Sequence, residues 1–196
     1  MNKLVSAPQT SARNSSWFRR LLSLSISLLA AGELHAQGSI PPEKVRVSES
    51  KKTQNYLKDG VFTGGDQSIE NVVIKNIRRA ANSGFERIVI DLDGVSAGKL
   101  QTLNRAPYFQ VAVSPEERRL TVSIWGDPQL HFNAKQILSS FKKSSWISSI
   151  DLLPQLEPEF WSFVLNLKSD TNVEVFELKE PVRIILDVKK NPSANL

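Results

Sequence analysis

From residue 69 onward, apolar and polar residues alternate along the chain with a period of two. In the clearest run, 85–92, Ile88, Ile90 and Leu92 share one face. Because successive side chains of a β-strand point to opposite faces of a sheet, this alternation predicts half-buried strands. We place strands at 69–77, 85–92, 108–113, 120–125, 146–153, 160–167, 172–178 and 182–188, with a short helix or irregular crossing at 134–141. Turn residues separate the strands, so we predict an all-β fold, an antiparallel sandwich.

The order of these strands contains an internal repeat. Residues 163–167 (FVLNL) resemble 88–92 (IVIDL), 75 positions earlier. Residues 183–188 resemble 119–124, which lie 64 positions earlier, and 172–178 resemble 108–113 at about the same distance. The repeat predicts a sandwich of two small pseudo-symmetric sheets of three strands each, although alternating apolar residues also recur by chance in β-proteins.

The first 36 residues have the order of a secretory signal peptide. Arg13, Arg19 and Arg20 form a basic start, residues 21–31 are apolar, and Ala36 supplies a small residue before the expected cleavage site. A membrane-spanning helix needs about 20 apolar residues, so we expect no integral membrane span once this segment is removed. A retained signal anchor or an amphipathic helix is the alternative. We expect an exported protein of the periplasm or cell envelope.

Residues 37–68 are polar, mixed in charge and interrupted by prolines and glycines. We expect a flexible polar linker here, in which Val45–Val47 is a candidate edge strand without further support. The expected organisation is a signal peptide at 1–36, the linker at 37–68, a β-domain at 69–190 and a tail at 191–196.

Composition removes several classes of function. The chain has no cysteine and two histidines, of which His35 lies in the predicted signal peptide. Disulfides, thiolate zinc sites and cysteine nucleophiles are therefore excluded, and His131 alone cannot build a zinc site of two or three histidines. Of the 25 basic and 20 acidic residues, four and one lie in residues 1–36, which leaves 21 and 19 for the rest. We expect no nucleic-acid partner, because no concentrated basic face remains, and no cofactor or metal.

Catalytic groups are hard to assemble from this sequence. A Ser-His-Asp triad would need His131 as its base, but we expect that residue at the surface or at a sheet edge, and there is no Gly-x-Ser-x-Gly motif. Asp91 and Asp93 lie on one strand face about 7 Å apart, in the range of glycosidase pairs. They lead into Gly94, so we interpret them as solvated turn carboxylates. We expect a protein that is not an enzyme.

Two stretches resemble a known family. Residues 77–94 (IRRAANSGFERIVIDLDG) are similar to the opening of an AMIN-type domain, in which arginine precedes an apolar strand closed by aspartate. Residues 175–188 (VFELKEPVRIILDV) resemble the closing strand of that family and its proline-containing lead-in, and Gly126–Leu130 resembles its central Gly-x-x-x-Leu segment. The resemblance covers roughly 69–190. It implies a β-sandwich of the bacterial envelope that localises by binding peptidoglycan, as AMIN domains do on murein amidases and on pilus or secretion channels.

Binding residues are easier to nominate than catalytic ones. Aromatic rings pack on the apolar faces of sugars, and arginines bind stem-peptide carboxylates. The ligand-binding residues that we predict are Arg87, Trp125, Lys142, Lys143, Trp146 and Arg183. We expect Trp146, beside two lysines in a serine-rich loop, to be the most exposed ring, and Trp161 to be half-buried in the core. The alternative for the arginines is cross-strand ion pairing of Arg87 with Asp91 and of Arg183 with Asp187.

These observations predict an exported, non-catalytic envelope module that binds peptidoglycan or localises to the cell wall. The alternative is a protein-interaction module that docks an envelope protein of a secretion, pilus or wall-remodelling complex through an open sheet edge. An enzyme of another type would need a cleft that converges on His131 or on Asp91 and Asp93.

Overall fold

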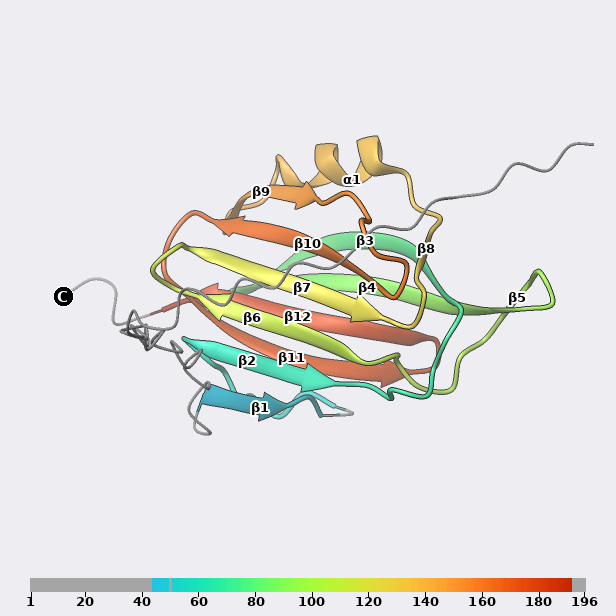
Figure 1. The fold of residues 1–196 in the computed structure, drawn as a ribbon. Coiled ribbons are helices and arrows are strands. Elements are labelled where there is room, and N and C mark those ends of the chain that lie inside the picture. The colour runs from blue at the N-terminus through green and yellow to red at the C-terminus, as the bar shows by residue number, and fades with distance from the viewer. Residues whose placement is uncertain (1–43, 50, 192–196) are drawn as a thin grey trace, which may run out of the picture. The chain divides into compact units, whose positions relative to one another are not determined.

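The computed structural model describes residues 44–49 and 51–191. The predicted signal peptide, the start of the predicted linker and residues 192–196 lie outside this part of the chain. The described residues form a β-sandwich of two six-stranded mixed sheets packed together, with one short helix (Figure 1). The predicted all-β sandwich with a short helix is confirmed.

The first sheet, which we call sheet A, draws its strands from both halves of the chain. Across the sheet they are β1 (Val45–Val47), β2 (Gly60–Gly64), β6 (Phe109–Ser114), β7 (Arg119–Trp125), β10 (Phe160–Leu167) and β9 (Ile147–Leu152). Neighbouring strands are antiparallel except β1 and β2, which are parallel.

The second sheet, sheet B, is built in a corresponding way. Across the sheet its strands are β11 (Thr171–Lys179), β12 (Val182–Lys190), β4 (Phe85–Ser96), β3 (Val72–Asn82) and β8 (Gln129–Leu130), and β5 (Lys99–Gln101) pairs with the end of β4. The pairing of β3 with β8 is parallel and the others are antiparallel.

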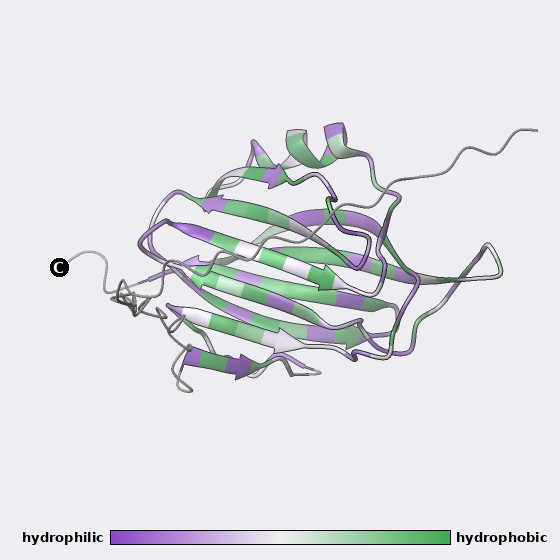
Figure 2. Cartoon of the chain, in the orientation of Figure 1, coloured by the Kyte–Doolittle hydropathy of each residue, from purple (hydrophilic) through white to green (hydrophobic). Residues whose placement is uncertain are grey.

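Alternation decides which side of each strand faces the core. In β7, Leu120, Val122 and Ile124 are fully buried, and the residues between them are partly exposed. Figure 2 shows this pattern as alternating pale and green bands along β7. Phe163 of β10 is buried in the same core. Burial of one large apolar side chain contributes about 1.5–3 kcal/mol, so facing rows of such residues hold the sheets together.

The one helix among the described residues lies against β9 and β3, at one edge of the sandwich (Figure 1). Helix α1 (Ala134–Phe141) begins after Asn133, whose side chain accepts a hydrogen bond from the backbone N–H of Gln136 at 3.1 Å. Such capping satisfies a donor that the first helical turn leaves unpaired. Ile137 and Phe141 are buried against the core. Among the described residues, no helix has the length and apolar character needed to cross a membrane.

The predicted internal repeat is visible in the topology and in the register. β6, β7 and β10 are neighbours in sheet A, as β11, β12 and β4 are in sheet B. Arg119 of β7 faces Asn166 of β10. In sheet B, Arg183 of β12 faces Asp91 of β4. Arg183 lies 64 positions after Arg119, and Asp91 lies 75 positions before Asn166, so the two pairs occupy equivalent places in the repeat.

The pseudo-symmetry extends to one strand more than predicted. β9 lies beside β10 as β3 lies beside β4. Each of these pairs has a register shift at an equivalent place, around Lys75 in β3 and around Ser148 in β9. A bulge shared at one position is a specific feature that chance alternation does not produce. The repeated unit therefore has four strands, β6-β7-β10-β9 and β11-β12-β4-β3, in place of three.

From residue 44 onward, the structure corrects the expectation of a flexible linker at 37–68. β1 and β2 lie in this range, and Leu57 and Phe62 are buried in the main core. β1 is the edge strand for which Val45–Val47 was the candidate. The sequence did not reveal these elements, because the range is polar in composition and each strand is too short to show a clear period.

Residues 51–57, which we call the N-terminal strap, lie over the outer face of sheet B at its β11 edge. The backbone N–H groups of Thr53 and Gln54 donate to Glu174 Oε1 at 2.7 and 2.5 Å. Leu57 exchanges two backbone hydrogen bonds with Val173, of 2.7 and 2.9 Å. Three apolar side chains of this outer face are buried as a separate cluster, namely Val89, Phe176 and Ile185.

Two predicted strands have bounds that differ from the structure by three residues or more. β3 spans Val72–Asn82 in place of 69–77, and β4 continues through Asp93 and Gly94 to Ser96. The expected turn at Asp93-Gly94 is therefore wrong. The chain reverses at Ala97 and Gly98, which have positive φ angles of 50° and 73° and join β4 to β5. Such a two-residue turn matches the twist of the strands on either side.

Candidate functional site

The six predicted binding residues do not form one site. Trp125 ends β7 on the outer face of sheet A, Arg87 and Arg183 lie on the outer face of sheet B, and Lys142, Lys143 and Trp146 follow α1. The structure therefore divides them among three regions of the surface.

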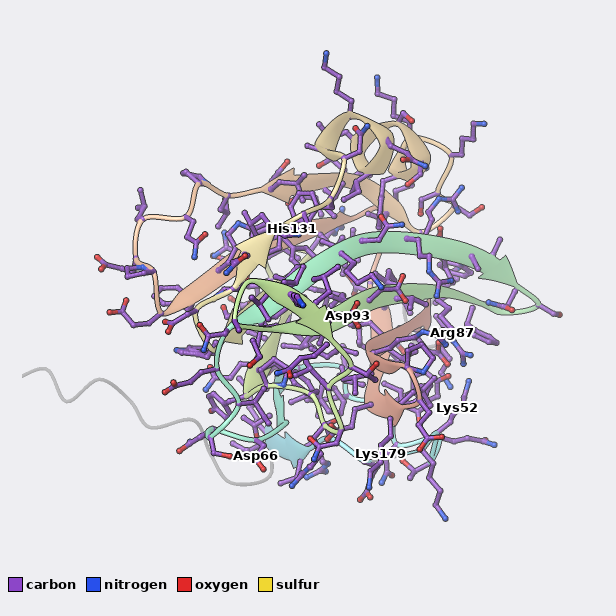
Figure 3. The ribbon with its side chains drawn as sticks, turned by 90° about the vertical axis from the view of Figure 1, so that its right-hand side faces the viewer. Lys52, Asp66, Arg87, Asp93, His131 and Lys179 are labelled. Atoms are coloured by element: carbon purple, nitrogen blue, oxygen red, sulfur yellow. The ribbon has the colours of Figure 1, made fainter. Side chains whose placement is uncertain are left out.

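Both arginines are engaged in ion pairs inside the fold. Arg87 donates to the two carboxylate oxygens of Asp187 at 2.7 and 2.8 Å, and Arg183 donates to Asp91 at 3.1 Å. The hydrogen bond to Asp187 raises the pKa of Arg87 above its usual range. Cross-strand pairing is present, but with partners exchanged relative to the prediction, because β4 and β12 are neighbours. Figure 3 shows Arg87 close to Lys52, whose ammonium also bonds Asp187 at 2.7 Å.

Trp146 is not the exposed ring that the sequence suggested. It is half-buried and packs against the main core. Its loop is fixed because the backbone N–H of Trp146 donates to Ser144 Oγ at 3.2 Å, and that hydroxyl donates to Glu86 at 2.6 Å. Trp161, expected to be half-buried, is 1 % exposed, and its indole N–H donates to the backbone oxygen of Leu153 at 2.8 Å.

Of the carboxylates and the histidine considered for catalysis, Asp91 lines a pocket of about 370 Å³ on sheet B, together with Lys75, Asn76 and Arg183. His131 is exposed directly after β8, and its backbone N–H donates to Ile74 O at 3.0 Å. Asp91 binds Arg78 and Arg183, and Asp93 binds Lys75. Among the described residues, no group of three or more potential ligands is placed to hold a metal ion.

Three aromatic side chains form a row across the outer face of sheet A, and we call Tyr108, Trp125 and Phe160 the aromatic row. Trp125 faces Phe160 in the register of β7 with β10, and its backbone N–H donates to Tyr108 O at 3.0 Å. The ring centroids lie 5.1 Å apart for Tyr108 and Trp125 and 5.6 Å apart for Trp125 and Phe160. Phe160 is 36 % exposed and the other two rings are partly exposed. Neighbouring strands lie about 4.8 Å apart, which keeps the three rings in contact.

Uncharged polar groups continue this face beside the aromatic row. Gln110, Ser123 and Ser162 lie side by side on β6, β7 and β10. Gln110 Nε2 donates to the Tyr108 hydroxyl at 2.6 Å, and the hydroxyls of Ser123 and Ser162 are 2.8 Å apart. This second row carries no charge, so it offers amide and hydroxyl groups to a ligand that makes neutral hydrogen bonds.

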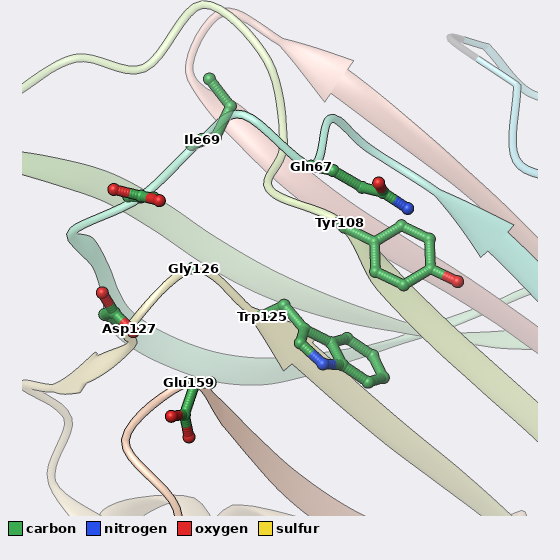
Figure 4. Close-up of a pocket in the computed structure, with 8 residues that line it drawn as sticks. Gln67, Ile69, Tyr108, Trp125, Gly126, Asp127 and Glu159 are labelled. Atoms are coloured by element: carbon green, nitrogen blue, oxygen red, sulfur yellow. The ribbon is translucent and has the colours of Figure 1, made fainter.

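A pocket of about 370 Å³ opens at one end of the aromatic row (Figure 4). Its lining consists of Gln67, Ile69, Glu70, Tyr108, Trp125, Gly126, Asp127 and Glu159. Gly126 has a positive φ of 94°, and a Cβ at this position would lie 2.4 Å from the carbonyl oxygen of Ile69. Only glycine therefore allows the loop after β2 to approach the end of β7 this closely.

Asp66 fixes that loop to the aromatic row. Its carboxylate accepts hydrogen bonds from the Ser68 hydroxyl at 2.7 Å and the Ser68 backbone N–H at 2.9 Å, which lower the pKa of Asp66. Its backbone oxygen accepts from the N–H of Tyr108 at 3.0 Å. One wall of the pocket is thus held by a local turn.

Comparison with known proteins places the chain in no family: no protein-family model matches it, and no curated protein matches it. The functional conclusion accordingly depends on the chemistry of the face itself.

Of the aromatic row, the sequence led us to nominate Trp125 as a binding residue, but it did not lead us to Phe160. A signal for Phe160 was present, because alternation along β10 sets Phe160 and Ser162 on the side opposite Trp161 and Phe163. What the sequence did not contain was the register that sets Phe160 beside Trp125.

Proposed function

We propose that this protein is an exported, non-catalytic envelope module, similar to AMIN domains, that binds peptidoglycan through the outer face of sheet A. The observation that carries the proposal is the aromatic row with its neighbouring row of neutral polar groups. Aromatic rings pack against the apolar faces of sugar rings, while amide and hydroxyl groups satisfy sugar hydroxyls. The three rings lie at intervals comparable with successive sugars of an extended glycan.

The remaining predicted binding residues have a smaller part in this proposal. Arg87 and Arg183 are matched by carboxylates within the fold, and Trp146 packs against the core. Lys142 and Lys143 are exposed but lie in the turn after α1, away from the aromatic row. Trp125 alone among the predicted residues belongs to the proposed glycan-binding face.

Co-sedimentation with purified sacculi tests the proposal. We expect the protein to pellet with sacculi at low salt and at about 0.5 M salt, because stacking and neutral hydrogen bonds are not screened. The double variant Trp125→Ala, Phe160→Ala should lose this binding. Lys142→Ala, Lys143→Ala is the matched control outside the row and should keep it. Circular dichroism of each variant verifies that the fold is intact.

Two results would contradict the proposal. Binding that disappears in salt and depends on Lys142 and Lys143 would show a non-specific attraction by charge. Absence of pelleting under both conditions would reject glycan binding by this face.

A second function, docking of an envelope protein, is favoured by two apolar features of the surface. β1 ends the path of sheet A, and Val47 on it is 74 % exposed. Leu156 is 83 % exposed beside an apolar pocket of about 300 Å³ that Phe160 also lines. Exposed edge strands and apolar patches are common protein-binding features. Cross-linking in intact envelopes, with Leu156→Ser as the test variant, should then trap a partner that the variant loses.

A further inference from the structure

The pocket at the end of the aromatic row combines aromatic walls with unmatched negative charge. Glu70, Asp127 and Glu159 line it together with Tyr108 and Trp125, and no lysine or arginine is among its lining residues. The three carboxylates are exposed and form no ion pair with any other described residue. In contrast, Asp91, Asp93 and Asp187 on sheet B are all paired with basic side chains.

The positions of sheet B that are equivalent to Phe160 and Trp125 give a second, independent indication of the ligand. Phe85, 75 positions before Phe160, has the ammonium of Lys52 at 4.1 Å from its ring centroid, and that ammonium also bonds Asp187 at 2.7 Å. Lys189, 64 positions after Trp125, holds its own ammonium 3.4 Å from the ring of Tyr56. In sheet B the chain itself therefore supplies ammonium groups against aromatic rings at this level of the fold.

The pocket of sheet A contains aromatic rings and carboxylates, but no ammonium group lies among its lining residues. Its rings and carboxylates are present at the same end of the repeated unit. An ammonium group over an aromatic ring is attracted by the ring quadrupole, and a neighbouring carboxylate adds a charge-assisted hydrogen bond.

We propose that this pocket binds a primary ammonium group carried by the glycan polymer. This inference rests on the proposed function, because the aromatic row must hold the polymer for the pocket to reach its amine. Two sources have this chemistry in a cell wall: an amino sugar without its acetyl group, and the free side-chain amine of a diamino acid in the peptide stem. The ammonium lies against Tyr108 and Trp125, and Asp127, Glu159 and Glu70 balance its charge.

Matched oligosaccharides test the proposal directly. The probes are a β-1,4-linked glucosamine tetramer and the N-acetylglucosamine tetramer, which share a backbone and differ in the amine. By isothermal titration calorimetry at low salt, we expect the glucosamine tetramer to bind about three- to tenfold more tightly, a range typical of exposed cation–π and ion-pair contacts. A lysine-containing stem tripeptide and its Nε-acetylated form are the second pair, and preference within one pair or the other identifies the source of the amine.

The variant Asp127→Asn, Glu159→Gln should abolish the preference while leaving binding of the acetylated tetramer unchanged. Glu116→Gln, Glu157→Gln removes the same net charge outside the pocket lining and is the matched control, which should retain the preference. A preference that survives the first variant would indicate diffuse attraction and would overturn the proposal.

The remaining outcomes separate this proposal from the glycan-binding function. Equal binding of the acetylated and the free-amine probes overturns the ammonium pocket and leaves glycan binding by the aromatic row in place. Absence of binding to every probe also overturns the pocket. In that case the sacculus experiment with Trp125→Ala, Phe160→Ala still decides the proposed function by itself.

Discussion

The outer faces of the two sheets occupy equivalent positions in a duplicated fold, yet their chemistry is opposite. On sheet B, Arg87 and Asp187 form an ion pair that Lys52 of the N-terminal strap completes. The equivalent residues of sheet A are Ser162 and Ser123, which share a single hydrogen bond of 2.8 Å. One backbone plan therefore supports a charged face that the strap covers and a neutral face over which none of the described residues forms such a strap.

The difference shows how the chain assigns a role to each face. Charges on sheet B hold the strap, and their partners lie within the same chain, so little binding capacity remains there for a ligand. On sheet A, the positions equivalent to Asp187 and Arg87 carry the hydroxyl groups of Ser123 and Ser162, which offer no charge to a lysine of the strap. With respect to the described residues, the partly exposed rings on that face are thus accessible to an external partner, because the strap lies on the other sheet.

The largest expected effect is a loss of stability, and it should differ between a buried phenylalanine on sheet B and an exposed one on sheet A. Phe176 on the outer face of sheet B is 3 % exposed and packs with Val89 and Ile185. We expect Phe176→Ala to lower the free energy of unfolding by about 3 kcal/mol, as for other buried phenylalanines. Phe160→Ala on sheet A should cost less than about 1 kcal/mol. Urea unfolding measures both, and similar losses would mean that the two faces are equally buried.

The next comparison removes one side chain from each pseudo-equivalent position. Asp187→Ala leaves Arg87 and Lys52 without their carboxylate, and both cations are about a third exposed, at 31 % and 32 %. We expect a loss of about 2–3 kcal/mol, below the value for a fully buried pair. Ser123→Ala removes one neutral hydrogen bond and should cost about 1 kcal/mol or less.

Limited proteolysis with trypsin supplies a second measurement on these two variants. Asp187→Ala should make the strap lysines cleavable, and Ser123→Ala should not. If the strap stayed protected in Asp187→Ala, charge would not be what holds it to sheet B.

A smaller effect is expected from alkaline pH, and it should act through sheet B. Burial acts to lower the pKa of Lys52, but the hydrogen bond and charge of Asp187 outweigh it and raise that pKa above 10.5. Burial raises the pKa of Tyr56 above 10.0. In both cases the folded chain holds the proton more tightly than the unfolded chain, so this stabilisation is complete below the unfolded values and is lost as pH rises through the folded ones.

We therefore expect the urea midpoint of the protein to fall as the pH is raised toward about 11. Lys52→Met should reduce that slope, because one of the two strap groups with a raised pKa is then absent. An unchanged slope in Lys52→Met would assign the alkaline sensitivity to another part of the protein.

The smallest effect concerns the loop that holds the pocket of sheet A. Asp66→Asn keeps an oxygen that can accept from Ser68 but removes the charge that strengthens those bonds. We expect about a twofold weaker affinity for sacculi and an unchanged unfolding midpoint at neutral pH, since charge-assisted bonds at exposed positions contribute little. Co-sedimentation over a series of sacculus concentrations would detect the change in affinity. A large loss of stability would mean that the loop supports the sandwich as well as the pocket.

Several features of the fold were readable from sequence because they depend on short-range patterns. Alternation along β7 and β10 identified their buried faces, and the repeated FVLNL and IVIDL runs indicated the duplication. The same logic failed for β1 and β2, since three and five residues are too few to define a period. It also failed at Asp93-Gly94, where turn-forming residues lie inside a strand that is held by pairing with β3 and β5.

The sequence by itself determined the class of the fold, the buried face of the longer strands and the absence of cysteine chemistry, because each follows from residue type and local spacing. Only the tertiary structure decided which outward residues become neighbours. Trp125 meets Phe160, and Arg87 meets Asp187, through strand registers that join distant parts of the chain. Such registers are set by packing of the two sheets and not by local preference, so the aromatic row and the covered face emerged only when the strands were assembled.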